Sequence, residues 1–572
     1  MMRRFATKPM LFMAIAFLAG ACSPASSAVT QVSPPAPARV GPKVLTIALT
    51  REPNGFVISL SASASTSGGA IQAQNLPANK LQNIDEKGQN YPELAEAIPS
   101  TTAGSWKINP DGTMETTWKL RPNIRWHDGE PVTADDLVFG YQAATAPGVP
   151  SLGAAYLRNI SDVVAQDSLT ALVKWSKPSP AADTPGDNLP ILPKHLLESE
   201  LAKGATSFMQ LPYWTSAFVG NGPFKLDQWL PGDQLQFSAF DGYFRGRPKL
   251  DRVIIRVVPD TNTQVANLLA GEIDMTLPVS IDTETALSIQ ERWAGTGNQV
   301  LLASPGNLRS FLPNSHPEYQ TPRELLDPRY RQALYRSVDR QAMSDLVTRG
   351  NAPIADSLLP AQHPLRAPLE SAIVRYPYDV GASMQALSDL GWSRAPDGVL
   401  RNADGREFRF KVWNTAEARA EREMNSAIAG WKQMGIQIEE VLVPATLIVS
   451  DEDRLHRDGI SIIGGIADEF LADRLSCDTI PTAANTFRGR NSGAWCSPQA
   501  QTFIDQLRVT IPQNQRIELQ RGLLGVIGTE LPIMPLYWDI DPILVLAAVK
   551  NVPLPSAPTR ISTFNIWAWD KE

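Results

Sequence analysis

The sequence has few of the residues that build metal sites and nucleophilic active sites. Three cysteines and five widely spaced histidines occur in 572 residues. No HExxH, GxSxG or P-loop pattern is present. The Gly-Asn-Gly run at 220–222 lacks the third glycine of a dinucleotide loop, and Pro223 interrupts the turn that such a loop needs. We therefore expect no metal site, no cofactor and no enzyme activity.

A basic charge balance and long apolar runs are also missing. The formal net charge is −7 and the isoelectric point is near 5.5, which argues against nucleic acid as a partner. Beyond the N-terminal segment, no apolar run reaches the length of about eighteen residues that indicates a membrane-spanning helix. Hydrophobic residues make up 43% and charged residues 19%, as in globular proteins, and the length predicts two or three lobes.

The chain begins with the features of an export signal. Basic residues precede an apolar run at 10–20, which is too short to span a bilayer. We interpret residues 1–21 as a signal peptide. The preceding Leu-Ala-Gly-Ala resembles a bacterial lipobox, so Cys22 is the predicted lipidation site and the mature chain would be anchored to a membrane. The alternative is an ordinary signal cleaved nearby, with Cys22 incidental.

Residues 22–42 are rich in serine, alanine and proline, which predicts an extended tether. If Cys22 is acylated, Cys477 and Cys496 remain as a pair in an exported protein, where disulfides form. We favour a bridge between them over two independent buried thiols. On the chain-entropy model, a loop of about twenty residues contributes about 3 kcal/mol.

Strand-like and helix-like segments alternate along the rest of the chain. "KVLTIALT" at 43–50 predicts a first strand, and Thr133 with Asp136 three places on predicts the start of a helix. Asp327 followed by Pro328 predicts another helix start. The mixture of βα units and hairpins predicts an α/β fold with mixed sheets.

Five segments occur in an order that makes the chain similar to a known family. They are "LRPNIRWHDGEPVTADDLVFGYQ", "GNGPFKLDQWLPGD", "YFRGRPKLDRVIIRVVPDTNTQVANLLAGEIDM", "DPRYRQALYRSVDRQAM" and "ELPIMPLYW". Together they resemble the extracytoplasmic solute-binding proteins of ABC importers, in the dipeptide- and oligopeptide-binding family (family 5). The resemblance covers residues 44–545. It implies a two-lobed periplasmic-binding-protein fold of type II, with a hinge and an additional domain.

The resemblance also implies domain boundaries. Lobe I is expected at 43–80, 205–300 and 531–572, the additional domain at 81–204, and lobe II at 301–530. Strands that cross between the lobes would form the hinge. The lobes would close around a ligand, and a membrane permease would recognise the closed form.

An aspartate that pairs with a peptide's amino terminus is implied after a glycine-rich strand. "SIIGGIADEF" places Asp468 there. An ammonium enclosed between lobes must meet an opposite charge or lose several kcal/mol. The family's Tyr-Pro-Asp-Pro continuation is replaced here by residues 469–472, which leaves peptide specificity open. A solvated loop acid is the alternative reading of Asp468.

The same region contains the cysteine pair. Dipeptide binders carry a disulfide at a comparable place, which supports a bridge between Cys477 and Cys496. The bridge would stiffen the segment that presents Asn485 and Trp495 toward the ligand. For Trp495, ordinary packing beside the disulfide is the alternative.

Small residues replace the large ones expected of a buried strand at 61–70. Family members contact the ligand main chain near this place. Ser67, Gly68 and Gly69 are therefore candidates for hydrogen-bonding an extended peptide in the manner of strand addition. The alternative is a surface loop.

The leading functional hypothesis is an exported monomer that is lipid-anchored to the cell membrane and faces the periplasm or cell exterior. It would bind peptides or similar small solutes and deliver them to an ABC transporter permease. One alternative is a receptor for a non-peptide ligand, such as a nickel chelate, haem, a sugar or an opine-like compound. Another is an envelope regulator or scaffold that does not transport. The fold does not decide among these, because one fold carries many ligands.

Overall fold

The computed structural model describes residues 41–60, 71–151, 154–278, 280–416, 418–444, 450–466, 474–485, 487, 489–554 and 562–572. Residues 42–572 form one compact unit. Five residues predicted from the sequence lie outside the described residues: Cys22, Ser67, Gly68, Gly69 and Asp468.

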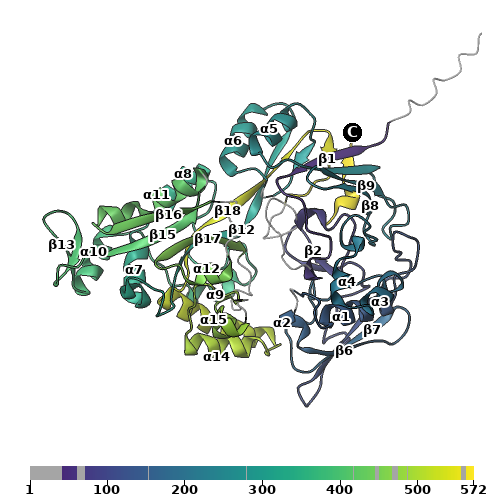
Figure 1. Ribbon diagram of the computed structural model, residues 1–572, viewed down its shortest axis with the longest axis horizontal. Coiled ribbons are helices and arrows are strands. Elements are labelled where there is room, and N and C mark those ends of the chain that lie inside the picture. The colour runs from purple at the N-terminus through teal and green to yellow at the C-terminus, as the bar shows by residue number, and fades with distance from the viewer. Residues whose placement is uncertain are drawn as a thin grey trace, which may run out of the picture. The chain divides into compact units, whose positions relative to one another are not determined.

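One mixed sheet of ten strands runs through the described part of the chain, in the order β16-β15-β17-β12-β18-β11-β1-β10-β9-β8 (Figure 1). The strands are β1 (Val44–Leu49), β8 (Phe224–Leu230), β9 (Gln234–Ala239), β10 (Arg252–Val257), β11 (Met275–Thr276), β12 (Gln299–Pro313), β15 (Arg409–Thr415), β16 (Gln437–Val443), β17 (Ile460–Ile466) and β18 (Met534–Val545). The strand predicted at 43–50 is confirmed as β1, which pairs in parallel with β10 and β11.

Smaller sheets stand beside the large one. A four-stranded sheet has the order β4 (Trp106–Ile108), β5 (Met114–Lys119), β7 (Thr170–Trp175) and β6 (Ile160–Ala165). The two-stranded sheets pair β2 (Gln82–Ile84) with β3 (Asn90–Pro92), β13 (Trp392–Arg394) with β14 (Leu400–Asn402), and β19 (Val549–Lys550) with β20 (Asp570–Lys571).

Helices pack against these sheets. They are α1 (Ala134–Thr145), α2 (Ala154–Leu157), α3 (Lys194–Leu201), α4 (Ala205–Met209), α5 (Thr261–Leu269), α6 (Thr283–Arg292), α7 (Pro328–Arg336), α8 (Arg340–Thr348), α9 (Arg366–Leu369), α10 (Val380–Asp389), α11 (Ala418–Gln433), α12 (Asp451–Leu455), α14 (Pro498–Leu507) and α15 (Gln513–Glu530). Short 3-10 turns lie at η1 (Ile58–Leu60), η3 (Pro212–Trp214), η4 (Arg323–Leu326), η5 (Glu370–Ala372), η6 (Cys477–Thr479), η7 (Ala483–Asn485) and η8 (Ile566–Ala568).

The helix starts predicted from capping residues are confirmed. Asp136 accepts a hydrogen bond of 2.8 Å from the Thr133 backbone N–H, which closes a capping box at α1. Asp327 accepts from the Arg329 backbone N–H at 2.9 Å, and Pro328 is the first residue of α7. Local polar residues therefore fix where these helices begin.

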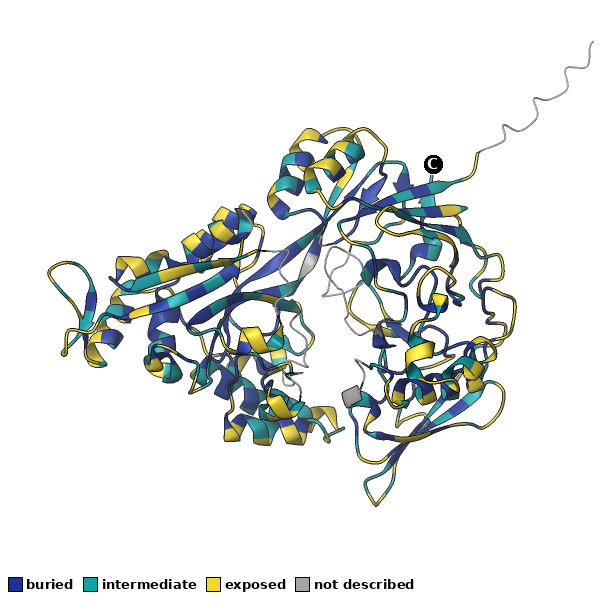
Figure 2. Cartoon of the chain, in the orientation of Figure 1, coloured by how far each residue is buried: buried dark blue, intermediate teal, exposed yellow. Residues whose placement is uncertain are grey.

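The two longest strands, β12 and β18, connect the hydrophobic cores. They pair antiparallel from Gln299↔Val545 to Phe311↔Met534, with register shifts between Ala303 and Asn307 and between Arg309 and Ser310. Ile543 and Val545 of β18 belong to one apolar cluster, whereas Met534 to Ile540 contribute to another. β18 is buried along almost its whole length, whereas the described residues of β12 are a mixture of buried and half-buried positions (Figure 2). The sheet that contains these two strands therefore extends from one apolar cluster to the other.

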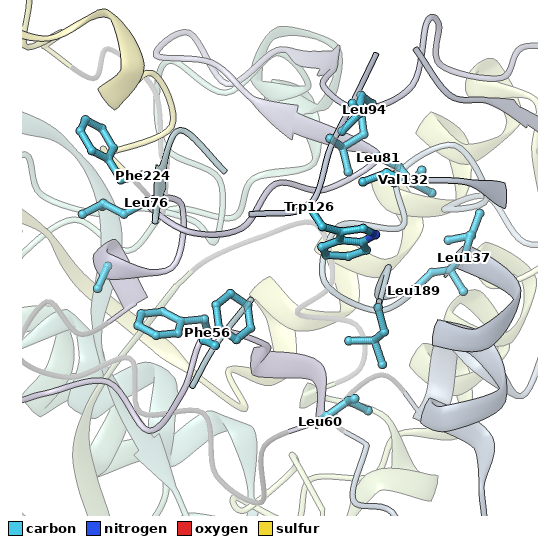
Figure 3. Packing of buried hydrophobic residues seen from close by; sticks show 14 of the residues in the cluster. Phe56, Leu60, Leu76, Leu81, Leu94, Trp126, Val132, Leu137, Leu189 and Phe224 are labelled. Carbon is cyan, nitrogen blue, oxygen red and sulfur yellow. The ribbon is translucent and has the colours of Figure 1, made fainter. Parts of the chain in front are cut away.

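The larger of these cores is rich in aromatic side chains. Trp126 is 2% exposed and packs among aliphatic side chains contributed by separate segments, including Leu81, Leu94, Val132 and Leu137 (Figure 3). Buried surface of this kind supplies the main driving force for folding.

The Gly-Asn-Gly run has a structural role. A Cβ at Gly220 would lie 1.8 Å from the carbonyl oxygen of Pro77, and one at Gly222 would lie 2.5 Å from that of Leu76. His127 joins the same loop: its Nδ1 accepts from the Gly220 N–H at 3.2 Å, and its Nε2 lies 3.0 Å from the Gly222 carbonyl oxygen. The glycines allow two backbones to approach closely.

Stability is expected to depend on pH through His127. Burial lowers the pKa of His127 to about 4, below the value near 6.5 of an unfolded chain. As the pH falls from about 6.5 to about 4, the unfolded chain takes up a proton that the folded chain does not. The free energy of unfolding therefore decreases. Between about pH 7 and pH 5, wild type should lose about 2 kcal/mol more than His127→Gln in urea unfolding. Equal losses in the two proteins would contradict this assignment.

Candidate functional site

The segment after β17 is closed by a disulfide. Cys477 and Cys496 are bonded, with their Cα atoms 4.8 Å apart and 19 positions between them in sequence. The predicted bridge is present, and the alternative of two independent thiols is wrong. Residues 474–496 are called the disulfide segment below.

A buried asparagine holds the disulfide segment together. Asn491 is 1% exposed, and its Nδ2 donates to the carbonyl oxygens of Ser476 at 3.0 Å and Trp495 at 2.7 Å. Its backbone N–H donates to the Thr479 carbonyl at 3.0 Å. These bonds join the two ends of the closed loop beside the covalent bond. Sequence reasoning did not single out Asn491, although the "RNSGAW" turn composition was a signal for it.

Trp495 is packed into a core. It is 5% exposed, shares an apolar cluster with Leu308 and Ile504, and donates from Nε1 to Glu530 Oε2 at 2.8 Å. Ser497 donates to the other oxygen of Glu530 at 3.0 Å. These contacts favour the packing alternative for Trp495. A ligand contact from its indole stays a prediction.

Asn485 holds its own turn. Its Nδ2 donates to the Ile480 carbonyl oxygen at 2.8 Å, and its Oδ1 accepts from the Thr482 backbone N–H at 2.9 Å. The side chain is partly exposed. Asn485 and Trp495 thus belong to one covalently closed segment, in which each side chain is occupied by local bonds.

A pocket lies between the strands and the disulfide segment. The space inside it that the centre of a water molecule can reach is about 50 Å³. Its lining comprises strand residues Leu308, Ser310, Leu312, Ile463 and Gly465, Ile533 before β18, and segment residues Arg474, Leu475, Arg490, Ser492 and Gly493. Mostly apolar walls with a few convergent polar groups are typical of small-molecule sites. We call this the segment pocket.

Two adjacent glycines in β17 serve opposite faces of the sheet. A Cβ at Gly465 would lie 3.0 Å from Arg474 Nη1, on the side of the segment pocket. A Cβ at Gly464 would lie 2.8 Å from Arg309 Nη1. Successive residues of a strand point to opposite faces, so each glycine leaves room for a different guanidinium.

Arg309 belongs to a buried charged network. It forms a bidentate ion pair with Glu423 of α11: Nε donates to Oε1 at 2.7 Å and Nη2 donates to Oε2. Tyr537 of β18 donates to the same carboxylate at 2.8 Å. Burial alone would raise the pKa of Glu423, which is 1% exposed, but the Arg309 charge and hydrogen bonds outweigh burial and lower it.

The network continues along β18. Arg419 of α11 pairs with Asp539, which is 5% exposed. Burial and the nearby Asp539 charge raise the pKa of Asp541 to about 7, while Arg419 opposes the shift. Asp539 and Asp541 face Asn307 and Ala303, the residues that flank the register shift in β12. The signal for this site was the acidic pair inside the otherwise apolar "PLYWDIDPILV".

The structure thus has a mixed α/β sheet that includes two long strands, and a disulfide-closed segment beside a pocket. Residues 96–471 match the family described as bacterial extracellular solute-binding proteins, family 5 Middle. The chain belongs to this family. The family consists of substrate-binding proteins, which confirms that the chain is not an enzyme.

Relatives and a solved structure agree with this assignment. The oligopeptide-binding protein AppA of Bacillus subtilis is 26% identical over 408 residues, covering 70% of each chain. The dipeptide-binding protein of Escherichia coli is 24% identical over 534 residues, covering 87% of this chain and 89% of the relative.

The structure of NikZ from Campylobacter jejuni in complex with Ni(L-His) superposes with a TM-score of 0.75. It is 23% identical and covers 93% of this chain and 100% of NikZ. The predicted α/β periplasmic-binding-protein fold is confirmed. Among the helices of the described residues, none has the length and apolar character needed to cross a membrane.

Proposed function

We propose that the chain is the extracytoplasmic receptor of an ABC importer, which binds a peptide or similar small solute and delivers it to a membrane permease. The observation that carries the proposal is the family match over residues 96–471. Relatives named for oligopeptide and dipeptide binding support a peptide as the ligand. A second candidate, a small metal complex, is supported by the nickel–histidine complex of NikZ.

The proposed mechanism is closure of two lobes. Lobe I would comprise residues 43–80, 205–300 and 531–572, and lobe II residues 301–530, with the additional domain at 81–204. Support comes from β12 and β18, which are paired with one another and contribute residues to both apolar clusters. A hinge in these strands would let the lobes close around a solute.

Membrane attachment is a further part of the proposal. Residues 1–21 would be removed, Cys22 would carry the lipid, and residues 22–42 would act as the tether of a monomer. Membership in an extracellular family supports export. Asp468 stays the proposed partner of a ligand ammonium group.

The ligand class is tested by native mass spectrometry of the gently purified protein, followed by calorimetry with peptides of two to five residues and with nickel–histidine. We expect peptides to bind with micromolar or tighter affinity, which corresponds to about −8 kcal/mol or below. N-acetylation should weaken binding to wild type and leave binding to Asp468→Asn unchanged. Binding of nickel–histidine alone would support the second candidate. If no solute copurifies with the protein and none of the added solutes binds, a non-transport role is supported.

A further inference from the structure

We propose that the segment pocket receives a carboxylate group of the bound solute, with Ser310 and Arg490 as its contacts. The inference rests on the proposed receptor function and specifies the chemical class of its solutes. It selects acidic solutes over neutral ones of the same shape.

Ser310 is the first observation that points to a ligand. Its side chain is 1% exposed, lines the segment pocket, and has an Oγ without a hydrogen-bond partner among the described residues. Most buried polar atoms in proteins are hydrogen-bonded, and leaving one unpaired is costly. A hydroxyl that faces a pocket can donate to an acceptor that arrives with the solute. Ser310 therefore marks a place where a hydrogen-bond acceptor is missing.

Arg490 supplies the positive charge. It lines the pocket and is exposed, and among the described residues it has no ion pair or side-chain hydrogen bond. Two acidic side chains of the described residues near the disulfide segment are already engaged. Glu530 binds Trp495 and Ser497, and Asp478 pairs with Arg508 at 3.0 Å.

Arg474 adds a second guanidinium to the lining, beside Gly465. Guanidinium groups match the planar geometry of a carboxylate and bind it through paired hydrogen bonds. The remaining walls are apolar, from Leu308, Leu312 and Ile463, and reduce competition from water. The lining therefore favours an anionic group over a cation.

Several bonds hold the segment that carries Arg490. Asn491, the next residue, is tied to both ends of the disulfide segment, and Cys477–Cys496 closes it. Gly493 lies so close to β12 that a Cβ there would be 2.7 Å from Leu312 Cδ1. Preorganisation of this kind reduces the entropy lost on binding.

The test uses three pools of tri- to pentapeptides. The peptides of the first pool contain one glutamate, and those of the second have glutamine at the same position. The third pool repeats the glutamate peptides with an amidated C-terminus. Competition calorimetry with the full chain should show binding of the glutamate pool tighter than the glutamine pool by about tenfold or more. If the main-chain carboxylate fills the pocket instead, amidation rather than glutamine will cause the loss.

Two variants and a control decide the site. Arg490→Gln should abolish the preference for a carboxylate. Ser310→Ala should reduce it without lowering the unfolding temperature, since the hydroxyl loses no hydrogen bond to any residue that the structure describes. Arg252→Gln, at an exposed arginine of β10, should keep the full preference. A preference that survives Arg490→Gln would overturn the inference.

Failure of the inference and failure of the receptor proposal give different results. If all three pools bind wild type with equal affinity, the receptor function stands and the carboxylate subsite is wrong. If none of the pools binds, the peptide-receptor proposal fails, and the inference that rests on it fails too.

Discussion

Replacing Glu423 with alanine is expected to destabilise the protein by about 3–5 kcal/mol, because it leaves buried positive charge without its partner. Glu423 is 1% exposed and receives hydrogen bonds from Arg309 and Tyr537. Asn414 also reaches its second oxygen, at 3.3 Å. These donors come from three strands, β12, β15 and β18, so the loss is felt across the sheet.

The measurement is urea unfolding followed by circular dichroism. Glu421→Ala is the matched control, since Glu421 lies on the same helix and is exposed, and surface changes there should stay within about 0.5 kcal/mol. Joint replacement of Arg309 and Glu423 by leucine should recover much of the loss, because no unpaired charge remains. A Glu423→Ala variant as stable as Glu421→Ala would show that the network does not hold the strands.

Opening the disulfide is expected to cost about 3 kcal/mol, the value that loop-closure entropy gives for a loop of this length. The bonded cysteines are 19 positions apart. Reduction frees the unfolded chain to explore more conformations, while Asn491 still ties the folded segment. The folded state should therefore survive reduction with a lower unfolding temperature.

Scanning calorimetry with and without reductant measures this effect. The double variant Cys477→Ser/Cys496→Ser should match reduced wild type and should not respond to reductant. If reductant lowers the unfolding temperature of that double variant as well, the loss in wild type does not come from this bond.

Local features of the fold were predictable from sequence. The alternation at 43–50 and the capping residues at Thr133 and Asp327 act over a few residues, and β1, α1 and α7 follow from them. The order of the ten strands was not predictable in this way. Neighbours such as β11 and β18 meet through Met275 and Val545, which are far apart in sequence. The overall architecture followed from the resemblance instead.

Some residues of the candidate site were predicted from the sequence and others were not, for a physical reason. The disulfide was predicted from the cysteine count, from the export that the N-terminal segment indicates, and from the family resemblance. Trp495 was ambiguous, because an indole can cover a ligand or fill a core, and only its contacts decide. Glu423 was missed, since a glutamate in an amphipathic helix looks like a solvated residue until its partners on other strands are known. Ser310 was missed for the same reason.

Arg309 and Ser310 are consecutive residues of β12, and they serve opposite faces of the sheet. Inserting or deleting a single amino acid upstream in this strand would exchange the two, placing a guanidinium against the apolar lining and a hydroxyl opposite Glu423. Laboratory efforts to change the solute specificity should therefore leave the length of β12 untouched. New specificity is more accessible by point substitution in the disulfide segment at a pocket-lining position such as Arg490, whose side chain has no ion pair or hydrogen bond among the described residues.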